Sequence, residues 1–487
     1  MPTTETTETS ASSSRRTIHI EKRSVGFVPR HERYGTAWSQ FTLWFGANLH
    51  ITTLVTGALA YVLGGDVFWS IIGLFIGQVA GGVVMALHAA QGPRLGLPQM
   101  ISSRAQFGVY GAALPLLLIV LMYLGFSASS TVLAGQAIAQ LYHGPDWTGI
   151  LTFGLVSAVF TVIGYKIIHR LSRWVSLVSI IAFVYLLIRF AMVADVGQLL
   201  SIREFSWTSF LLAIALSASW QIAYGPYVAD YSRYLPAETS ARSVFSCALG
   251  GTVISSTIAM TFGVFIAAWA GESFEGHEVG TVVSLGTGGL VAGLIYLSIA
   301  IGKLSINVLN TYGGFMSMMT TYSGFRGKAE VPQVLRILSI LAMTAVSMLM
   351  ALIGRDEFLP AFSSFLLFLL TAFVPWSAIN LADFYWISHE KYDVPALADP
   401  DGRYGRWNWA ALIAFVGGVL IQLPFVSTHF YTGPLVEKLG GTDISWIVGL
   451  VATAILYMAL RPLDPRTIPE RTILPEEDPS EPLSIKE

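Results

Sequence analysis

Apolar runs long enough to cross a lipid bilayer recur along most of this sequence. A membrane-crossing helix needs roughly 20 mostly apolar residues, and runs of that length follow one another from Thr36 to Leu460. Charged residues make up only 12% of the chain, whereas a soluble globular protein carries roughly 25%. The sequence therefore predicts an all-α polytopic membrane protein with about 12 transmembrane helices.

The two ends of the sequence differ from this apolar region. Residues 1–35 are rich in Ser, Thr and basic side chains, and residues 461–487 are rich in Pro and Glu. Segments of such composition bury too little apolar surface to form a packed core. We therefore predict a disordered N-terminal tail over 1–35, a transporter domain over 36–460 and a disordered C-terminal tail over 461–487.

Charge alternates between successive loops of the predicted spans. One set of loops carries most of the Lys and Arg residues, namely Arg94, Arg104, Lys166, Arg170, Arg173, Arg233, Arg242, Arg326, Lys328, Lys391, Arg403 and Arg406. The other set is mainly acidic. Short loops rich in Lys and Arg stay in the cytoplasm, so we predict a multi-pass protein of the plasma (inner) membrane with both termini cytoplasmic. The formal net charge of −2 gives no sign of a nucleic-acid partner.

Two predicted spans contain residues that interrupt a helix. The sixth has Gly225 and Pro226 near its middle, where proline removes a backbone hydrogen bond. The first contains Gly46, Asn48 and Gly57 among several threonines. Interruptions at matching places in two halves are typical of inverted-repeat transporters whose site lies at the interruptions. The alternative is that glycine and threonine are simply common in membrane helices.

Polar residues within the third and eighth predicted spans share helix faces. Tyr123 and Ser127 are one turn apart, and Lys303, Asn307 and Asn310 follow the spacing i, i+4 and i+7. A lysine in mid-membrane usually lines a pathway or pairs with an acid. Asparagine offers a donor and an acceptor, which suits the edge of a pyrimidine or purine. A lone asparagine often bonds a neighbouring helix, but the three-residue stripe favours a polar cavity.

Aromatic residues flank the interruption in the sixth span. Trp220, Tyr224 and Tyr227 lie there, and Tyr123 is available from the third span. Aromatic faces hold a flat conjugated ligand well, although many Trp and Tyr residues in membrane proteins are interfacial anchors. Trp220 is too deep in its span for an anchor, so the pattern favours a planar ligand.

Four separated stretches carry a further signal: Gly92–Gln99 with Ser103–Gly108, Ala229–Tyr234, the pair Asn307 and Asn310, and Pro375–Asp383. Together they resemble the nucleobase:cation symporters, the permeases for cytosine, purines, uracil, thiamine and allantoin. The stretch Ala229–Tyr234 is most similar to the purine–cytosine branch. The resemblance implies a LeuT-like five-plus-five inverted repeat with two additional C-terminal helices.

The resemblance also implies a set of site residues, because members of this family bind ligand between the broken first and sixth spans and the third and eighth. The implied substrate-binding residues are Asn48, Tyr123, Ser127, Trp220, Gln221, Tyr224, Asn307 and Asn310. The sixth-span aromatic of the family matches either Trp220 or Tyr224, depending on where the gap is placed. The predicted function is secondary active import of a nucleobase or related planar heterocycle by cation symport.

The coupling cation is where the sequence departs from sodium-coupled relatives. Those relatives supply two neighbouring hydroxyl groups from the eighth span, whereas this chain has only Ser305, with Lys303 before it. A buried lysine can provide a fixed or titratable charge in place of a bound cation. We therefore assign cation coupling to Lys303 and Ser305 and favour a proton over sodium. Ser305 and backbone carbonyls leave sodium open.

The same residues also bear on other classes of function. An intramembrane enzyme needs a nucleophile–base pair or a metal cluster, and the spans contain neither pattern, so we predict no enzyme activity, no cofactor and no metal. An amino-acid or other small-solute symporter of the same fold is an alternative, because such a transporter binds a zwitterion at exposed half-helix ends. A sodium-coupled permease of the allantoin, hydantoin or uracil type is another.

Overall fold

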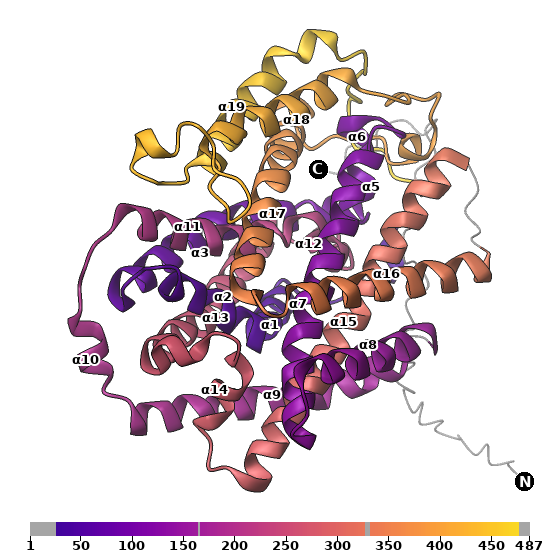
Figure 1. Ribbon diagram of the computed structural model, residues 1–487. Helices are drawn as coiled ribbons and strands as arrows, with labels where there is room; N and C mark the ends of the chain where they lie inside the picture. The colour runs from indigo at the N-terminus through magenta and orange to yellow at the C-terminus, as the bar shows by residue number, and fades with distance from the viewer. Residues whose placement is uncertain (1–25, 164–165, 327–331, 477–487) are drawn as a thin grey trace, which may run out of the picture.

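The computed structural model describes residues 26–163, 166–326 and 332–476 as helices joined by loops (Figure 1). Its longer helices are α1 (Trp38–Asn48), α2 (Ile51–Val62), α3 (Val67–Ala89), α7 (Ala113–Tyr142), α8 (Asp146–Ile163), α9 (Lys166–Val193), α11 (Trp207–Ile222), α12 (Gly225–Ser232), α13 (Ala241–Ala270), α15 (Gly289–Arg326), α16 (Gln333–Gly354), α17 (Phe358–Leu381), α18 (Trp409–Gln422) and α19 (Ser445–Ala459). Short helices include α4 (Gly92–Leu95), α5 (Gln99–Ser102), α6 (Arg104–Phe107), α10 (Val196–Ser201), α14 (Glu278–Ser284) and the π-helical turn Ala382–Ile387. The predicted all-α class is confirmed.

The helices that can cross a membrane follow the predicted spans. Within the described residues, seven helices are long and apolar enough, and the bent pair α1 and α2 makes an eighth. Three further apolar helices are shorter: Leu177–Val193, Trp409–Phe425 and Ser445–Ala459. The chain is therefore multi-pass. The number of about 12 spans and the five-plus-five repeat stay predictions.

Close helix packing brings the interrupted spans together. Helix α11 lies along α3, and α13 packs against α1, α2 and α3. Gly57 of α2 and Gly263 of α13 allow this approach, because a Cβ on Gly263 would lie 1.8 Å from the Leu54 carbonyl oxygen. Small residues of this kind are typical of tight membrane-helix contacts. A second group forms where α15 lies along α7 and α16 packs on α7 and α8, while α18 and α19 pack with α17 (Figure 1).

Both predicted interruptions are real breaks between helices. The axes of α1 and α2 differ by 64°, and α2 begins after His50, whose Nδ1 accepts the Thr52 backbone N–H at 3.2 Å. Helix α11 ends at Ile222 and α12 begins at Gly225. Pro226 lies in the first turn of α12, where a missing N–H leaves no intrahelical bond unmade.

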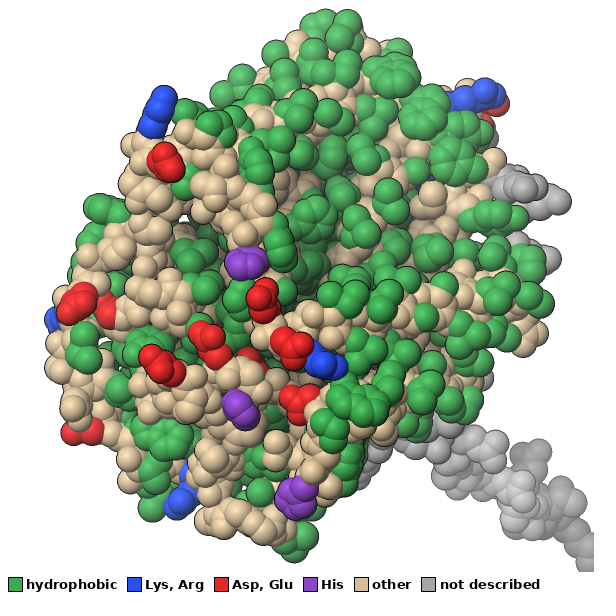
Figure 2. All heavy atoms as spheres, viewed as in Figure 1, with side chains coloured by type: hydrophobic (Ala, Val, Ile, Leu, Met, Phe, Trp, Pro, Cys, Tyr) green, Lys and Arg blue, Asp and Glu red, His purple; other side chains and the backbone are tan. Residues whose placement is uncertain are grey.

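The surface carries both exposed apolar side chains and an acidic region. Large apolar side chains are exposed on several predicted spans, for example Leu155, Ile163, Leu290 and Ile353, as expected of helices that contact lipid. Figure 2 shows Asp and Glu side chains gathered on the face where Figure 1 places α10 and α14. Some of the loop charges used to predict orientation lie outside the described part of the chain. They are Lys328 and the side chains of Lys166, Arg170, Arg173 and Arg326.

Described parts of the two predicted tails contact the helices, while the domain boundaries at 35 and 461 stay predictions. Near the N-terminal end, Val28 is buried and Arg33 donates to the Pro93 carbonyl at 2.6 Å. Near the C-terminal end, Arg466 and Leu474 are buried. Hydrogen bonds and the ion pairs of Arg466 with Asp383 and Asp464 hold these residues, and composition does not reveal such specific contacts. Residues 1–25 and 477–487 lie outside the described residues.

Candidate functional site

The two breaks meet through Asn48, the last residue of α1. Its Oδ1 accepts hydrogen bonds from Trp220 Nε1 and from the Tyr224 hydroxyl, both at 2.8 Å. Trp220 lies in the last turns of α11, and Tyr224 lies between α11 and α12. Side chains from both interrupted spans therefore converge on one amide oxygen, and both aromatic candidates of the sixth span take part.

The amide of Asn48 has only one orientation that satisfies its neighbours. The side chain is fully buried, and its Nδ2 donates to the Trp44 carbonyl at 2.7 Å and to Thr252 Oγ1 at 3.1 Å. An indole N–H can only donate and a carbonyl can only accept. The oxygen of Asn48 must therefore face Trp220, and its nitrogen must face Trp44.

Aromatic rings form a continuous group around this amide. Tyr224 lies 5.1 Å from Trp44 between ring centroids, 6.0 Å from Trp220 and 5.8 Å from Tyr227. Tyr227 in turn lies 5.9 Å from Tyr123 of α7. Edge-to-face and tilted contacts of this kind stabilise aromatic pairs beyond their burial, so the rings form an ordered set at the junction of the breaks with α7.

The α7 candidates lie where α7 faces α15. The Tyr123 ring covers Gly313, and a Cβ there would lie 2.6 Å from Tyr123 Cζ, so glycine makes room for the phenol. Ser127 is 1% exposed, and its hydroxyl has no hydrogen-bond partner among the described residues. Because buried polar groups are nearly always partnered, the Ser127 hydroxyl is an available contact for a bound ligand.

Gln221 points away from the aromatic rings. It is fully buried, and its Nε2 donates to Gln78 Oε1 of α3 and to Ser256 Oγ of α13, the latter at 3.4 Å. Its Oε1 accepts from Thr252 at 2.7 Å. The residue next to Trp220 in sequence therefore lies between packed helices, because adjacent residues of an α-helix project in directions about 100° apart.

Lys303 of α15 contacts the start of α2. Its Nζ donates to Thr52 Oγ1 and lies 3.4 Å from His50 Nδ1. The lysine is 2% exposed, and no ion pair joins it to a carboxylate in the described part of the chain. Ser305 bonds only the Ile301 carbonyl of its own helix, at 3.4 Å. A buried cation thus lies between an interrupted span and α15.

The predicted stripe on α15 divides among several neighbours. Asn307 donates to Ser157 Oγ of α8 at 2.8 Å, and its Oδ1 has no partner among the described residues. Asn310 is half-buried. Lys303 and Asn307 therefore contact different helices, α2 and α8, although they are one turn apart in α15.

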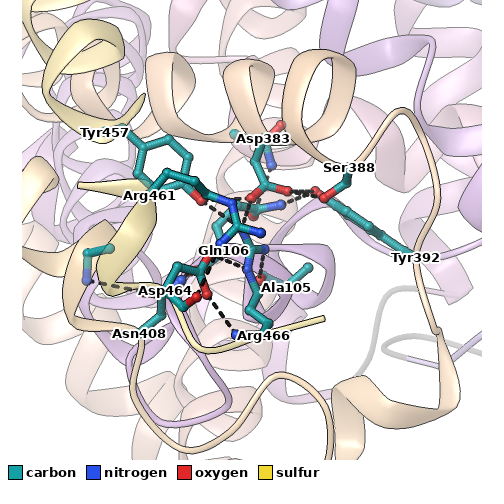
Figure 3. Close-up of polar contacts among 12 residues, drawn as sticks. Ala105, Gln106, Asp383, Ser388, Tyr392, Asn408, Tyr457, Arg461, Asp464 and Arg466 are labelled. Atoms are coloured by element: carbon teal, nitrogen blue, oxygen red, sulfur yellow. Dashed lines mark hydrogen bonds and ion pairs between the residues drawn. The ribbon is translucent and has the colours of Figure 1, made fainter. Parts of the chain in front are cut away.

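A second buried polar cluster, which the sequence analysis missed, surrounds Asp383 at the end of α17 (Figure 3). Arg466 donates to Asp383 Oδ2, to the Ala105 carbonyl and, at 2.6 Å, to Asp464. Tyr457 and Tyr392 also donate to Asp383, at 2.7 and 2.8 Å. We call these residues the Asp383 cluster. Its one sequence signal was an aspartate at the end of an apolar span.

A chain of amides joins the Asp383 cluster to the end of α3. Gln106 donates to the Tyr392 hydroxyl and accepts from Asn380 at 3.3 Å. Asn380 Oδ1 accepts from Gln91 at 2.9 Å, and Gln91 Oε1 accepts from Gln99 at 3.0 Å. The loop with the family-like pattern is therefore fixed to both α3 and α17.

Among the described residues, no three His, Cys, Asp or Glu side chains gather as a metal site.

Comparison with known proteins adds independent findings. Residues 27–449 match the family model described as permease for cytosine/purines, uracil, thiamine, allantoin. The chain is 41% identical over 450 residues to the putative purine-cytosine permease YxlA of Bacillus subtilis (strain 168), covering 91% of this chain and 96% of that one. It is 26% identical over 461 residues to the purine-cytosine permease fcyB of Emericella nidulans, covering 92% and 89%.

Solved structures show the same fold. The inward-facing conformation of Mhp1 matches with a TM-score of 0.74 at 17% identity, covering 90% of this chain and 93% of that one. Mhp1, a nucleobase-cation-symport-1 family transporter, also matches in a closed conformation with bromovinylhydantoin bound, with a TM-score of 0.70, 17% identity and coverage of 91% and 95%.

Proposed function

The chain belongs to the family of permeases for cytosine/purines, uracil, thiamine and allantoin, and from this premise we propose that it imports a purine- or cytosine-like base together with a proton. Membership of this family makes it a nucleobase transporter of the purine–cytosine branch and not an enzyme. The particular base, the coupling to a cation and the choice of proton are the proposal.

The substrate site is proposed to lie at the junction of the two breaks. The observation that carries this is the Asn48 oxygen shared by Trp220 and Tyr224, since it joins both interrupted spans in one aromatic group. Tyr123 extends that group to α7, and Ser127 supplies a buried hydroxyl without a partner among the described residues. A planar base would stack on the rings and bond Ser127 and Asn310 along its edge.

Substrate competition combined with one substitution tests this site. Uptake of labelled cytosine and hypoxanthine should saturate and compete with purine or pyrimidine bases but not with leucine. Trp220→Ala should abolish saturable uptake at normal membrane expression, because the stacking area is lost. Trp269→Ala, on a half-exposed ring of α13, is the matched control and should transport normally.

Three outcomes would contradict the substrate proposal. Competition by leucine but by no base would indicate an amino-acid symporter of the same fold. Normal uptake by Trp220→Ala and by Tyr123→Ala together would mean that these rings serve packing alone. Competition by allantoin or uracil with strict sodium dependence would instead indicate a sodium-coupled permease of that type.

Lys303 is proposed as the coupling residue. A charged lysine in a bilayer is costly and is normally paired or functional, yet this one has only Thr52 and His50 beside it. An ammonium group here would occupy the contact between α2 and α15 that a bound sodium ion would otherwise make, with Ser305 as the remaining hydroxyl. Under this proposal a protonophore collapses uptake in energised vesicles, and replacement of sodium by choline leaves uptake unchanged. Strict dependence on external sodium would overturn it.

The orientation is proposed from the loop charges, with both termini on the cytoplasmic side of the plasma (inner) membrane. The acidic face in Figure 2 would then be external. Single cysteines introduced at Arg94 and Arg242, which are both exposed, in a variant without Cys247 should resist an impermeant thiol reagent added from outside. A cysteine introduced at Glu275 should react, and labelling at both arginine positions would reverse the orientation.

A further inference from the structure

A line of hydrogen bonds leads from Asn48 away from the aromatic rings and into packed helices. Asn48 Nδ2 donates to Thr252 Oγ1 at 3.1 Å, and Thr252 donates to Gln221 Oε1 at 2.7 Å. Gln221 Nε2 donates to Gln78 Oε1, and Gln78 Nε2 points at Met260 Sδ, 2.9 Å away. We call Asn48, Thr252, Gln221 and Gln78 the Asn48 relay. All four side chains have 0% exposure.

Each member of the Asn48 relay accepts on one side and donates on the other. A threonine hydroxyl has a single proton, and Thr252 gives it to Gln221, so its oxygen is left to accept from Asn48. Gln221 is oriented in turn, because its oxygen faces Thr252 and its nitrogen faces Gln78. Hydrogen bonds in such a series polarise one another in a low-dielectric interior. Thr252 is therefore the single hydroxyl that joins two oriented amides.

The relay reaches the aromatic rings through Asn48. Its Oδ1 accepts hydrogen bonds from Trp220 Nε1 and from the Tyr224 hydroxyl. Preorganised side chains bind ligand more tightly because less freedom is lost on binding. The placement of both rings thus depends on a threonine that contacts neither.

We propose that Thr252 is a positioning residue of the nucleobase site, which sets substrate affinity through Asn48 without touching the substrate. This inference rests on the proposed function. It adds α13 to the elements that determine affinity, although α13 contributes no ring to the aromatic group. The hydroxyl, and not the size of the side chain, carries the effect.

The same helix offers a matched control. Thr257 of α13 has a buried hydroxyl without a partner among the described residues, so Thr257→Val removes a hydroxyl and breaks no bond. Thr252→Val should weaken binding of labelled cytosine or hypoxanthine to the purified protein about fivefold to tenfold, because two hydrogen bonds are lost. Thr257→Val and Thr252→Ser should bind within about twofold of the unmodified protein, since the relay stays intact in both.

A double-mutant cycle separates positioning from general loosening. In an Asn48→Ala background, Thr252→Val should cause no further loss of affinity, because the effect passes through Asn48. Full additivity in this cycle would overturn the proposal. So would equal losses for Thr252→Val and Thr257→Val, or failure of Thr252→Ser to restore affinity.

A second variant keeps the test decisive if Thr252→Val does not fold. Gln221→Met removes the acceptor that orients Thr252 but leaves the hydroxyl, so its loss of affinity should lie between those of Thr257→Val and Thr252→Val, about twofold to fivefold. Unchanged affinity in Gln221→Met would also overturn the proposal. If the unmodified protein binds none of cytosine, hypoxanthine and uracil, the proposed substrate class fails and this inference fails with it.

Discussion

Lys303 and Arg466 are both buried cations, but their surroundings differ in kind. Arg466 has two carboxylate partners, Asp383 and Asp464, and its side chain is 4% exposed. Lys303 is 2% exposed, and its contacts in the described chain are the Thr52 hydroxyl and the His50 imidazole. Burial lowers the pKa of Arg466, but the attraction of Asp383 outweighs it and raises that pKa above its ordinary value.

The contrast distinguishes a region that resists rearrangement from a region whose bonding can change during transport. Each charged side chain of the Asp383 cluster has an oppositely charged partner, so any rearrangement must break ion pairs and hydrogen bonds (Figure 3). Around Lys303 and Ser127, a charge lacks a counterion and a hydroxyl lacks a partner among the described residues. A buried ammonium group without a counterion is stabilised by losing its proton, and a buried hydroxyl without a partner is stabilised by bonding a ligand. Four predictions test this contrast, in order of decreasing effect.

Loss of Arg466 should be the most damaging change. Arg466→Met leaves Asp383 buried without its cation, which costs about 3–5 kcal/mol of unfolding free energy, measured by thermal unfolding in detergent. The double variant with Asp383→Asn should recover part of this loss, because a neutral amide then replaces the buried Asp383 carboxylate. Arg403→Met is the control, since its pair with Asp393 is partly exposed and should be worth at most about 1 kcal/mol. Normal stability of Arg466→Met would remove the contrast.

Lys303→Met should show the opposite pattern. No carboxylate is left unpaired, so the midpoint of thermal unfolding should stay the same or rise. Accumulation of base against a gradient should fall at least about tenfold under the proposed coupling, while exchange of internal for external base persists. Lys438→Met, an exposed change, serves as the control. Full accumulation by Lys303→Met would end the coupling assignment.

The two asparagines of α15 should separate binding from stability. Asn310→Ala should weaken base binding about tenfold and leave the unfolding free energy unchanged, because a ligand contact is lost. Asn307→Ala should cost about 1 kcal/mol of stability, because it breaks the bond to Ser157, and it should change affinity less. Parallel Kd and unfolding measurements decide the matter. The reverse assignment would place the ligand at Asn307.

Glu278 at the start of α14 extends the comparison to a buried anion. Gln136 Nε2 donates to it at 2.6 Å, and burial raises the pKa of its carboxyl above the ordinary value of 4.5. The folded state then holds a proton that the unfolded state releases, so Glu278 reduces stability as pH rises through and above that value. Glu278→Gln should raise the unfolding free energy by on the order of 1 kcal/mol near pH 7 and leave it unchanged near pH 4. Glu275→Gln, at an exposed position, is the control and should leave the unfolding free energy unchanged at both pH values.

The sequence predicted the interrupted spans well because their causes are local. Pro226 and Gly225 interrupt a helix wherever it packs, and an apolar run of sufficient length has few alternatives to a membrane helix. The structure accordingly has breaks after Asn48 and before Gly225. The same reasoning placed Trp220 and Tyr224 beside a break, but it could not reveal the Asn48 oxygen that joins them.

Side-chain directions were less accessible to sequence reasoning. The family resemblance implies Gln221 as a substrate-binding residue, yet its amide bonds side chains of α3 and α13. The face of a helix shows which residues lie together, but not which neighbour covers them, as Asn307 and Lys303 illustrate. The contact of Arg466 with Asp383 could not be predicted for another reason. Asp383 lies 83 residues earlier, and the composition around Arg466 resembles that of a disordered tail.

The position of Arg466 in the chain has a consequence for biosynthesis. Asp383 leaves the ribosome 83 residues before the arginine that neutralises it, and α18 and α19 are made in between. During that interval α17 ends in an uncompensated carboxylate, so the bundle cannot reach its final stability before Arg466 is synthesised. A chain that stops between α19 and Arg466 would contain the helices from α1 to α19 and still lack that contact, so the buried Asp383 carboxylate would remain without its arginine.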